Sequence, residues 1–323
     1  MKTMREMNRL MNFRTLALFL LLLPMLAQAQ RIVFTPQWTP QSQFAGYYVA
    51  WEKGFYKEAG LDVDFQHPSA SYSARNRLIE GSSDIITMQL QEALVELDRG
   101  VEMVNILQTS QHNGVCIVSR HDNIRTIEDL RGKKVGVWKA GFGDLARILD
   151  VERNLEIQWI SFIENTNLYI SGAIDATLAM SYNECLQIQA AGYEDKPVML
   201  LLDEGYDYPE DGLYVSMDFY RRYPEKAKAF AEASKRGWEY AHKNPEEALD
   251  IVMKTIKREN LKSGRYHQEK MLAEILRLQC DTPGSAPSFE LHPEDVKKLS
   301  DLLLKHRRIN EPVTYEMLKG GKL

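Results

Sequence analysis

The sequence predicts an α/β protein of two domains, each built on a mainly parallel sheet, and three observations support this prediction. The chain has 323 residues, which is too long for one small core and suits two domains of ordinary size. Hydrophobic residues make up 44% and charged residues 26%, as in a globular protein. From Arg31 onward, short β-rich runs alternate with helical patterns, which is typical of sheets covered by helices on both faces.

The first 29 residues form a predicted secretory signal. Four basic residues precede an apolar run from Leu16 to Leu26, and Ala27 and Ala29 form an A-x-A cleavage site. The run is shorter than the roughly twenty residues that span a bilayer, which favours a cleaved signal over an uncleaved anchor. No cysteine lies near the cleavage site to carry a lipid. We therefore expect a periplasmic mature chain that begins at Gln30.

Charge and side-chain chemistry exclude several classes of partner. The signal carries four basic residues and one acid, a net of +3, so its removal changes the formal charge from −5 to −8. An acidic protein argues against nucleic acid or an anionic membrane as the main partner. Cys116, Cys185 and Cys280 are odd in number and widely spaced, which indicates buried thiols, although one pair stays open. The seven histidines are dispersed, so we expect no metal site and no cofactor.

The predicted strands fall into two sets. The first set reads "RIVFTP", "LDVDF", "DIITM" and "VEMVNILQT", and the second reads "KKVGVW", "IQWISF", "DATLAM" and "VMLLLD". Between them, an extended run at 115–119 suggests that the chain changes domains, and another at 211–220 suggests that it returns. We therefore expect one lobe from residues 30–118 and 213–323 and a second lobe from residues 119–212.

Helices are expected in the C-terminal part, from about residue 224 to residue 306. In "KNPEEALDIVMKTI", Asn244 is the expected N-cap, Pro245 the first helical residue and Glu247 the partner in a capping box. The apolar residues of this segment form one buried stripe, in which Met253 is expected to be core.

Candidate binding residues come from the turns that follow strands, because small molecules bind at the carboxyl ends of strands in open parallel sheets. In the first turn, Trp38, Gln41 and Gln43 lie in a loop before a helix expected at 44–60. The helix carries five aromatics on one face, a pattern more typical of core, although we keep Tyr47 as a candidate. Gly46 would permit close approach of a ligand or a neighbouring strand to the first helical turn.

Two further turns add weaker candidates. After "DIITM", Met88 and Gln89 lie at the expected mouth of the first sheet. After "KKVGV" comes "WKAGFGD", whose glycines could present backbone N-H groups to a carboxylate, a phosphate or a ring edge. This segment is neither a Walker loop nor a full dinucleotide pattern. Its candidates are Trp138, Gly141, Phe142 and Gly143.

The fourth turn follows "DATLAM" and contains Tyr182, Asn183 and Glu184. A carboxylate at a helix start is often structural, because the helix dipole favours negative charge there. If Glu184 faces a cleft, it can accept hydrogen bonds from an amino-substituted heterocycle while Tyr182 stacks on the ring.

The segment "QWTPQSQFAGYYVAWEKGFYKEAGLDVDF", together with "IEGSSDIITM", "LRGKKVGVW" and "YNE", resembles substrate-binding proteins related to fungal thiamine-pyrimidine synthases. These include the formylaminopyrimidine-binding proteins of ABC importers, and SsuA-type sulfonate binders belong to the wider family. The resemblance implies a type II periplasmic-binding fold with two lobes joined by two hinge strands. It also implies that Trp38 and the group Tyr182, Asn183 and Glu184 contact a pyrimidine ring.

We therefore expect a monomeric, non-catalytic solute-binding protein that closes over a flat nitrogenous heterocycle, a thiamine pyrimidine precursor, and delivers it to an ABC transporter permease. Only Lys139 lies near the turns, which disfavours an anionic ligand. Two alternatives stay open. One is an enzyme like the pyridoxal-phosphate-linked pyrimidine synthases, with Lys53 or Lys57 and His67 as its only candidate groups. The other is a ligand sensor for a membrane receptor.

Overall fold

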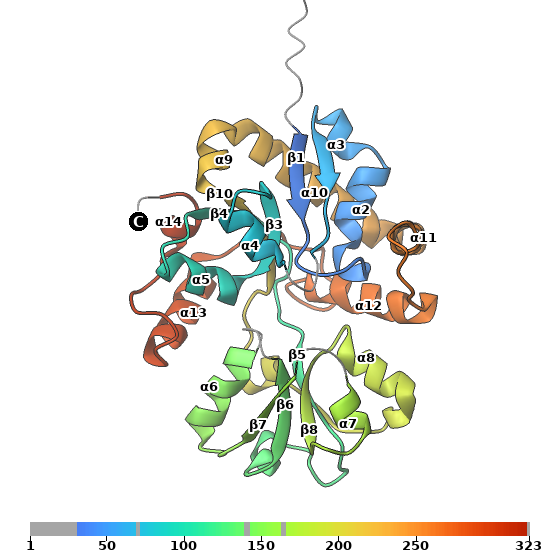
Figure 1. Cartoon of the computed structure of the whole chain (residues 1–323), viewed down its shortest axis with the longest axis vertical. Helices are drawn as coiled ribbons and strands as arrows, with labels where there is room; N and C mark the ends of the chain where they lie inside the picture. The colour runs from blue at the N-terminus through green and yellow to red at the C-terminus, as the bar shows by residue number, and fades with distance from the viewer. Residues whose placement is uncertain (1–30, 69–71, 139–142, 163–165, 322–323) are drawn as a thin grey trace, which may run out of the picture.

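The protein folds into two lobes, each built on a five-stranded sheet (Figure 1). The computed structural model describes residues 31–68, 72–138, 143–162 and 166–321, so the predicted signal lies outside the described residues. The predicted α/β class with two lobes is confirmed. The sheets, however, are mixed and not mainly parallel.

The first sheet has the strand order β2-β1-β3-β10-β4. Its outer pairs β2-β1 and β1-β3 are parallel, whereas β10 runs antiparallel to both β3 and β4. The direction of β10 follows from its origin, because it carries the chain back from the second lobe. The bounds are β1 Arg31–Thr35, β2 Asp62–Phe65, β3 Ile85–Gln89, β4 Met103–Gln108 and β10 Asp211–Ser216.

The second sheet repeats this plan with the order β7-β6-β8-β5-β9. Strand β6 is parallel to β7 and β8, and β5 is antiparallel to β8 and β9. All of β5 therefore belongs to the second sheet, and the chain leaves the first sheet before the expected boundary at residue 118. The bounds are β5 Val115–Ser119, β6 Lys134–Trp138, β7 Gln158–Phe162, β8 Ala176–Met180 and β9 Val198–Leu200.

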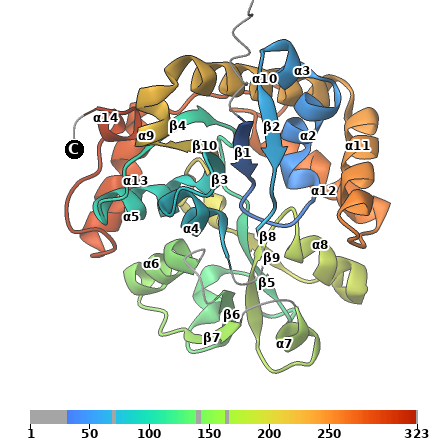
Figure 2. The same cartoon turned by 45° about the horizontal axis from the view of Figure 1, so that its top comes forward.

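Helices cover both lobes and the C-terminal part of the chain packs on the first (Figures 1 and 2). Those of the first lobe are α2 Ala45–Glu52, α3 Phe55–Glu58, α4 Ala74–Ile79, α5 Leu90–Asp98, α9 Met217–Arg222, α10 Pro224–Lys243, α11 Pro245–Arg258, α12 Arg265–Leu278, α13 Pro293–Lys305 and α14 Tyr315–Leu318. Those of the second lobe are α6 Asp144–Arg153, α7 Asn167–Ile170 and α8 Glu184–Ile188.

Helices α2 and α10 approach each other closely at two glycines. A Cβ at Gly46 would lie 2.2 Å from the Trp238 ring, and a Cβ at Gly237 would lie 2.0 Å from the carbonyl oxygen of Gly46. The expected close approach at Gly46 therefore exists, but its partner is the Trp238 indole of helix α10 and not a ligand or a strand. This contact anchors the start of α2, which follows the loop that carries Trp38.

Two local predictions differ from the structure. The helix expected at 44–60 is divided, because Gly54 adopts a φ of 79° between α2 and α3. Helix α11 begins at Pro245 after Asn244, as predicted, but the side chain of Asn244 caps no N-H of that helix. Glu247 instead accepts hydrogen bonds from Lys53 and Tyr240 on neighbouring helices. Tertiary contacts have replaced the local capping box.

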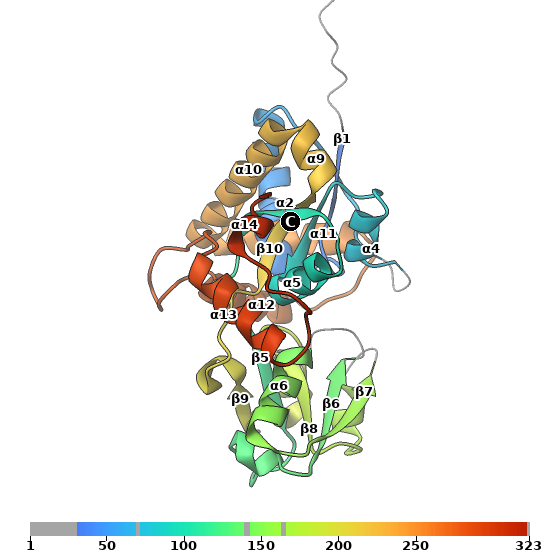
Figure 3. The same cartoon turned by 90° about the vertical axis from the view of Figure 1, so that its left-hand side faces the viewer.

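Hydrogen bonds join the two lobes at their facing edges. Helix α12 of the first lobe lies at this boundary (Figures 1 and 3), where Glu274 Oε1 accepts from the Ser181 hydroxyl at 2.8 Å. On the other flank, His306 Nε2 lies 2.8 Å from Glu152 Oε1 of α6. The lobes are thus in contact in this structure.

Candidate functional site

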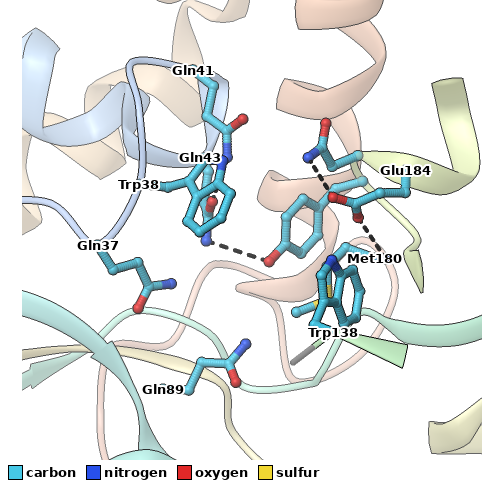
Figure 4. Close-up of a pocket in the computed structure, with 10 residues that line it drawn as sticks. Gln37, Trp38, Gln41, Gln43, Gln89, Trp138, Met180 and Glu184 are labelled. Atoms are coloured by element: carbon cyan, nitrogen blue, oxygen red, sulfur yellow. Dashed lines mark hydrogen bonds between the residues drawn. The ribbon is translucent and has the colours of Figure 1, made fainter. Parts of the chain in front are cut away.

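A pocket lies between the lobes. Figure 4 shows Gln37, Trp38, Gln41 and Gln43 on one side and Trp138, Met180 and Glu184 on the other. The first group comes from the loop after β1, and the second from the ends of β6 and β8 and the start of α8. The ten lining residues are Gln37, Trp38, Gln41, Gln43, Gln89, Trp138, Met180, Tyr182, Asn183 and Glu184.

The wall from the first lobe is a loop held by hydrogen bonds. The Trp38 carbonyl oxygen lies 2.9 Å from His67 Nδ1, and the Gln41 amide donates to Gln43 Oε1 at 2.6 Å. The first bond holds the backbone at Trp38, while Trp38 itself stays 40% exposed. An exposed indole on a fixed loop can cover a flat ring without a large ordering cost.

The wall from the second lobe begins where β8 ends at Met180. Glu184 folds back on this turn, because its Oε2 accepts from the Met180 N-H and its Oε1 from the Asn183 amide, both at 3.0 Å. Burial raises the pKa of the Glu184 carboxyl. A carboxylate can accept about four hydrogen bonds, so Glu184 retains capacity for a ligand donor. The glutamate is therefore part of the turn and of the pocket.

A direct contact between the walls comes from Tyr182. Its hydroxyl accepts from the Gln43 amide at 3.3 Å, which links the fourth turn to the first across the pocket. Tyr182 is buried, and burial raises the pKa of its phenol well above the usual value. The tyrosine is thus neutral at physiological pH and presents an aromatic face without charge.

Most of the candidates from the sequence meet in this pocket, and three described ones do not. Trp38, Gln41, Gln43, Gln89, Trp138, Tyr182, Asn183 and Glu184 all line it. Tyr47 is buried against Phe34 and Trp238, and Met88 is buried in β3, so both are core residues. Gly143 packs on Val137 at the start of α6. Gly141 and Phe142 lie outside the described residues.

Sequence reasoning missed four residues at or beside the site. Gln37 and Met180 line the pocket. Gln37 directly precedes the candidate Trp38, and Met180 lies two positions before the candidate Tyr182. Glu210 and Asp211 lie at the start of β10, where they hydrogen-bond Gln89 and Gln43. The run "PED" ahead of an extended segment is a signal for the pair, because consecutive acids rarely enter a buried strand without a role.

The candidate groups of an enzyme lie elsewhere. The Lys53 ammonium contacts Glu247 at 2.9 Å and Tyr240 at 3.1 Å on the outer surface, and Lys57 is exposed. His67 supports the Trp38 loop from outside the pocket. Within the described ranges, no three His, Cys, Asp or Glu side chains are grouped to hold a metal ion. All three cysteines are free and buried.

The fold and the pocket can now be compared with known proteins. A family model described as NMT1/THI5 like matches residues 41–248, which is more than half of the chain. The chain belongs to the NMT1/THI5-like family. The matched residues begin at Gln41, after Trp38 in the first turn, include the whole turn with Tyr182, Asn183 and Glu184, and end within α11.

Within this family the relatives have different functions. The riboflavin-binding protein RibY of Chloroflexus aurantiacus is 24% identical, over 70% of this chain and 67% of RibY. The formylaminopyrimidine-binding protein of Halalkalibacterium halodurans is 21% identical over 86% of each chain. A 4-amino-5-hydroxymethyl-2-methylpyrimidine phosphate synthase of Saccharomyces cerevisiae is 24% identical, over 68% of this chain and 69% of the synthase.

A solved structure supports the fold. The periplasmic aliphatic sulphonate binding protein SsuA from Escherichia coli superposes with a TM-score of 0.64 at 14% identity, covering 90% of this chain and 92% of SsuA. The predicted type II periplasmic-binding fold is therefore confirmed. Within the described residues, no helix is both long enough and apolar enough to cross a bilayer.

Proposed function

We propose that this protein is a monomeric periplasmic solute-binding protein that closes over a flat nitrogenous heterocycle, a thiamine pyrimidine precursor, and delivers it to an ABC importer in the inner membrane. The observation that carries the proposal is the shared pocket: Trp38 from one lobe and Tyr182 to Glu184 from the other line the same space. Closure of the two lobes would bring the exposed indole of Trp38 and the buried phenol of Tyr182 against the same ligand ring.

The chemistry of the lining favours an amino-substituted ring over an anion. Of the ten lining residues that the structure describes, none is Lys, Arg or His. A sulfonate or phosphate would enter beside the carboxyl of Glu184 without a cation among the described lining residues to balance it. An aminopyrimidine would instead offer N-H donors to that carboxyl and to the glutamine amides.

Export and transport complete the proposal. The predicted signal segment would place the chain in the periplasm, where relatives such as SsuA are described as binding proteins. Two lobes that close on a ligand would present one shape to a permease when loaded. An acidic surface agrees with a small-molecule carrier that avoids membranes and nucleic acid.

The rival proposal is a synthase-like enzyme that uses pyridoxal phosphate. Such chemistry would need a lysine amine at the pocket to form a Schiff base with the cofactor. Lys53 is held by Glu247 and Tyr240 away from the lining, which favours the carrier.

Titration calorimetry of the mature chain tests the proposal. The ligands are 4-amino-5-hydroxymethyl-2-methylpyrimidine, formylaminopyrimidine, riboflavin, an alkanesulfonate and pyridoxal phosphate. We expect reversible binding of one equivalent of an aminopyrimidine, with much weaker binding of the sulfonate. Preference for riboflavin or the sulfonate would contradict the ligand class, and a covalent adduct with pyridoxal phosphate would favour the enzyme.

A further inference from the structure

Asp211 lies beside the pocket at the point where the chain returns to the first lobe. Strand β10 runs antiparallel to β3, which places Asp211 opposite Gln89 in the sheet. The Asp211 side chain accepts from the Gln37 amide at 2.8 Å through Oδ1 and from the Gln43 amide at 2.7 Å through Oδ2. Both carboxyl oxygens therefore hold the amide nitrogen of a residue that lines the pocket.

Glu210 makes the same arrangement with different partners. Its Oε1 accepts from the Gln89 amide at 2.6 Å, and its Oε2 accepts from the backbone N-H of Gly114 at 3.1 Å. Glu210 and Asp211 are 5% and 6% exposed. Each of their four oxygens thus accepts one N-H, so ionised forms of both acids are satisfied by hydrogen bonds although burial raises the pKa of each.

These bonds determine which way the glutamine amides point. An ionised carboxylate only accepts hydrogen bonds, so the amide nitrogens of Gln37, Gln43 and Gln89 must face it. Gln43 uses its nitrogen for Asp211 and for the Tyr182 hydroxyl, and its Oε1 already accepts from Gln41. Its hydrogen-bonding groups are therefore occupied before any ligand binds.

Gln37 is left with an unused acceptor. Its Oε1 is buried and has no hydrogen-bond partner within the described part of the chain. A buried carbonyl oxygen without a partner costs about 1 to 3 kcal/mol, which a ligand N-H would recover. Gln37 lines the pocket, so a ligand held there can supply this donor.

Charge leads to the same ligand class. Glu184, Glu210 and Asp211 are three carboxyl groups in or directly behind the pocket, and no described lining residue carries a positive charge. Two described imidazoles contact lining residues: His67 Nδ1 lies 2.9 Å from the Trp38 carbonyl oxygen, and His267 Nε2 lies 3.2 Å from Asn183 Oδ1. Burial lowers the pKa of both histidines, which favours their neutral forms. A protonated ring would therefore meet no like charge among the described lining residues.

We propose that Glu210 and Asp211 are positioning residues that set ligand specificity. By holding the glutamine amide nitrogens, they leave hydrogen-bond acceptors facing the pocket. These acceptors select a protonatable ring that carries an amino group over the same ring with a carbonyl group at that position. This inference rests on the proposed function and specifies its ligand as an amidine-like, donor-rich heterocycle. Glu210 and Asp211 act through the glutamines and do not need to touch the ligand.

The test compares two ligands that differ in one group, 4-amino-2-methylpyrimidine and its 4-oxo analogue. In the wild-type mature chain we expect calorimetry to show at least roughly tenfold preference for the amino compound, since sites built for a hydrogen bond reject analogues that lack it. Asp211→Asn places a side-chain NH₂ group near the Gln37 amide. Gln37 can then rotate its amide, so that its oxygen accepts from the asparagine and no longer serves the ligand. We expect the preference to fall by about tenfold or more, mainly through weaker binding of the amino compound.

Two further variants separate specificity from folding. Gln37→Met leaves both acids intact and removes the unused acceptor, so it should weaken only the amino compound. If Asp211→Asn does not fold, the binding ratio of Gln37→Met alone tests the inference. Asp207→Asn is the matched control, because Asp207 bonds His112 and the Asn113 N-H outside the pocket lining, and we expect it to keep the wild-type ratio.

The outcomes distinguish this inference from the proposed function. If the wild-type chain binds the amino compound but the ratio is unchanged in Asp211→Asn and Gln37→Met, only the inference is overturned. Equal wild-type affinity for the two compounds also overturns it. If the wild-type chain binds neither pyrimidine, the proposed function is refuted and the inference falls with it.

Discussion

Removing the indole of Trp38 should weaken ligand binding strongly and leave folding almost unchanged. The side chain is 40% exposed, so on the order of 100 Å² of a large aromatic is available and a stacked ring would cover about half of it. At about 25 cal/mol per Å² this burial contributes about 1.3 kcal/mol, and ring stacking adds about 0.5 to 1.5 kcal/mol. Trp38→Ala should therefore raise the Kd for the aminopyrimidine roughly 20- to 100-fold.

The assay is calorimetry on the mature wild-type and variant chains, with thermal unfolding as the folding control. The Trp38 backbone carbonyl keeps its bond to His67, so the free energy of unfolding should change by less than about 0.5 kcal/mol. Tyr266→Ala is the matched control, since Tyr266 is 68% exposed and lies outside the pocket lining. An affinity that is equal in wild type and Trp38→Ala would refute stacking on this indole.

Three other predictions concern the pocket and the fold. Glu184→Gln should weaken binding of the aminopyrimidine by roughly 1 to 3 kcal/mol in calorimetry, because the amide replaces a charged acceptor; unchanged affinity would remove Glu184 from the binding residues. Gly237→Ala should lower the free energy of unfolding in urea by about 1 to 3 kcal/mol, since its Cβ would lie 2.0 Å from the Gly46 carbonyl oxygen; an unshifted midpoint would contradict this packing. Burial raises the pKa of Asp211, so the folded state binds this proton more tightly than the unfolded state, and the stabilisation is lost as pH rises through the folded pKa. The ligand-free wild type should therefore lose Tm relative to Asp211→Asn as the pH rises above the ordinary aspartate range, and parallel curves would exclude a raised pKa.

The sequence predicted the turns of the site well, because the carboxyl ends of strands are where loops and helix starts meet in this architecture. Trp38 precedes the periodic aromatic stripe, and that position separated it from core residues. Glu184 was found as a polar residue at a helix start. Its bonds to Met180 and Asn183 could not be predicted, because they depend on how the turn closes.

Other features depended on contacts between distant segments. The antiparallel course of β10 places Glu210 and Asp211 beside glutamines more than a hundred residues earlier, and no local pattern encodes such a pairing. Met88 directly precedes the lining residue Gln89, and Tyr47 lies four positions after Gln43, but strand alternation and the helical period direct both side chains into the core. Gly54 ends α2 through its positive φ, although a single glycine within a helical pattern is often tolerated.

The position of the bound ring relative to both lobes tests the central claim most directly. A crystal structure of the mature chain with an aminopyrimidine should show the ring between Trp38 and Tyr182, with its amino group toward Glu184. A ring bound elsewhere on the surface, or a pocket filled by the protein's own side chains while the ligand is bound, would contradict the account.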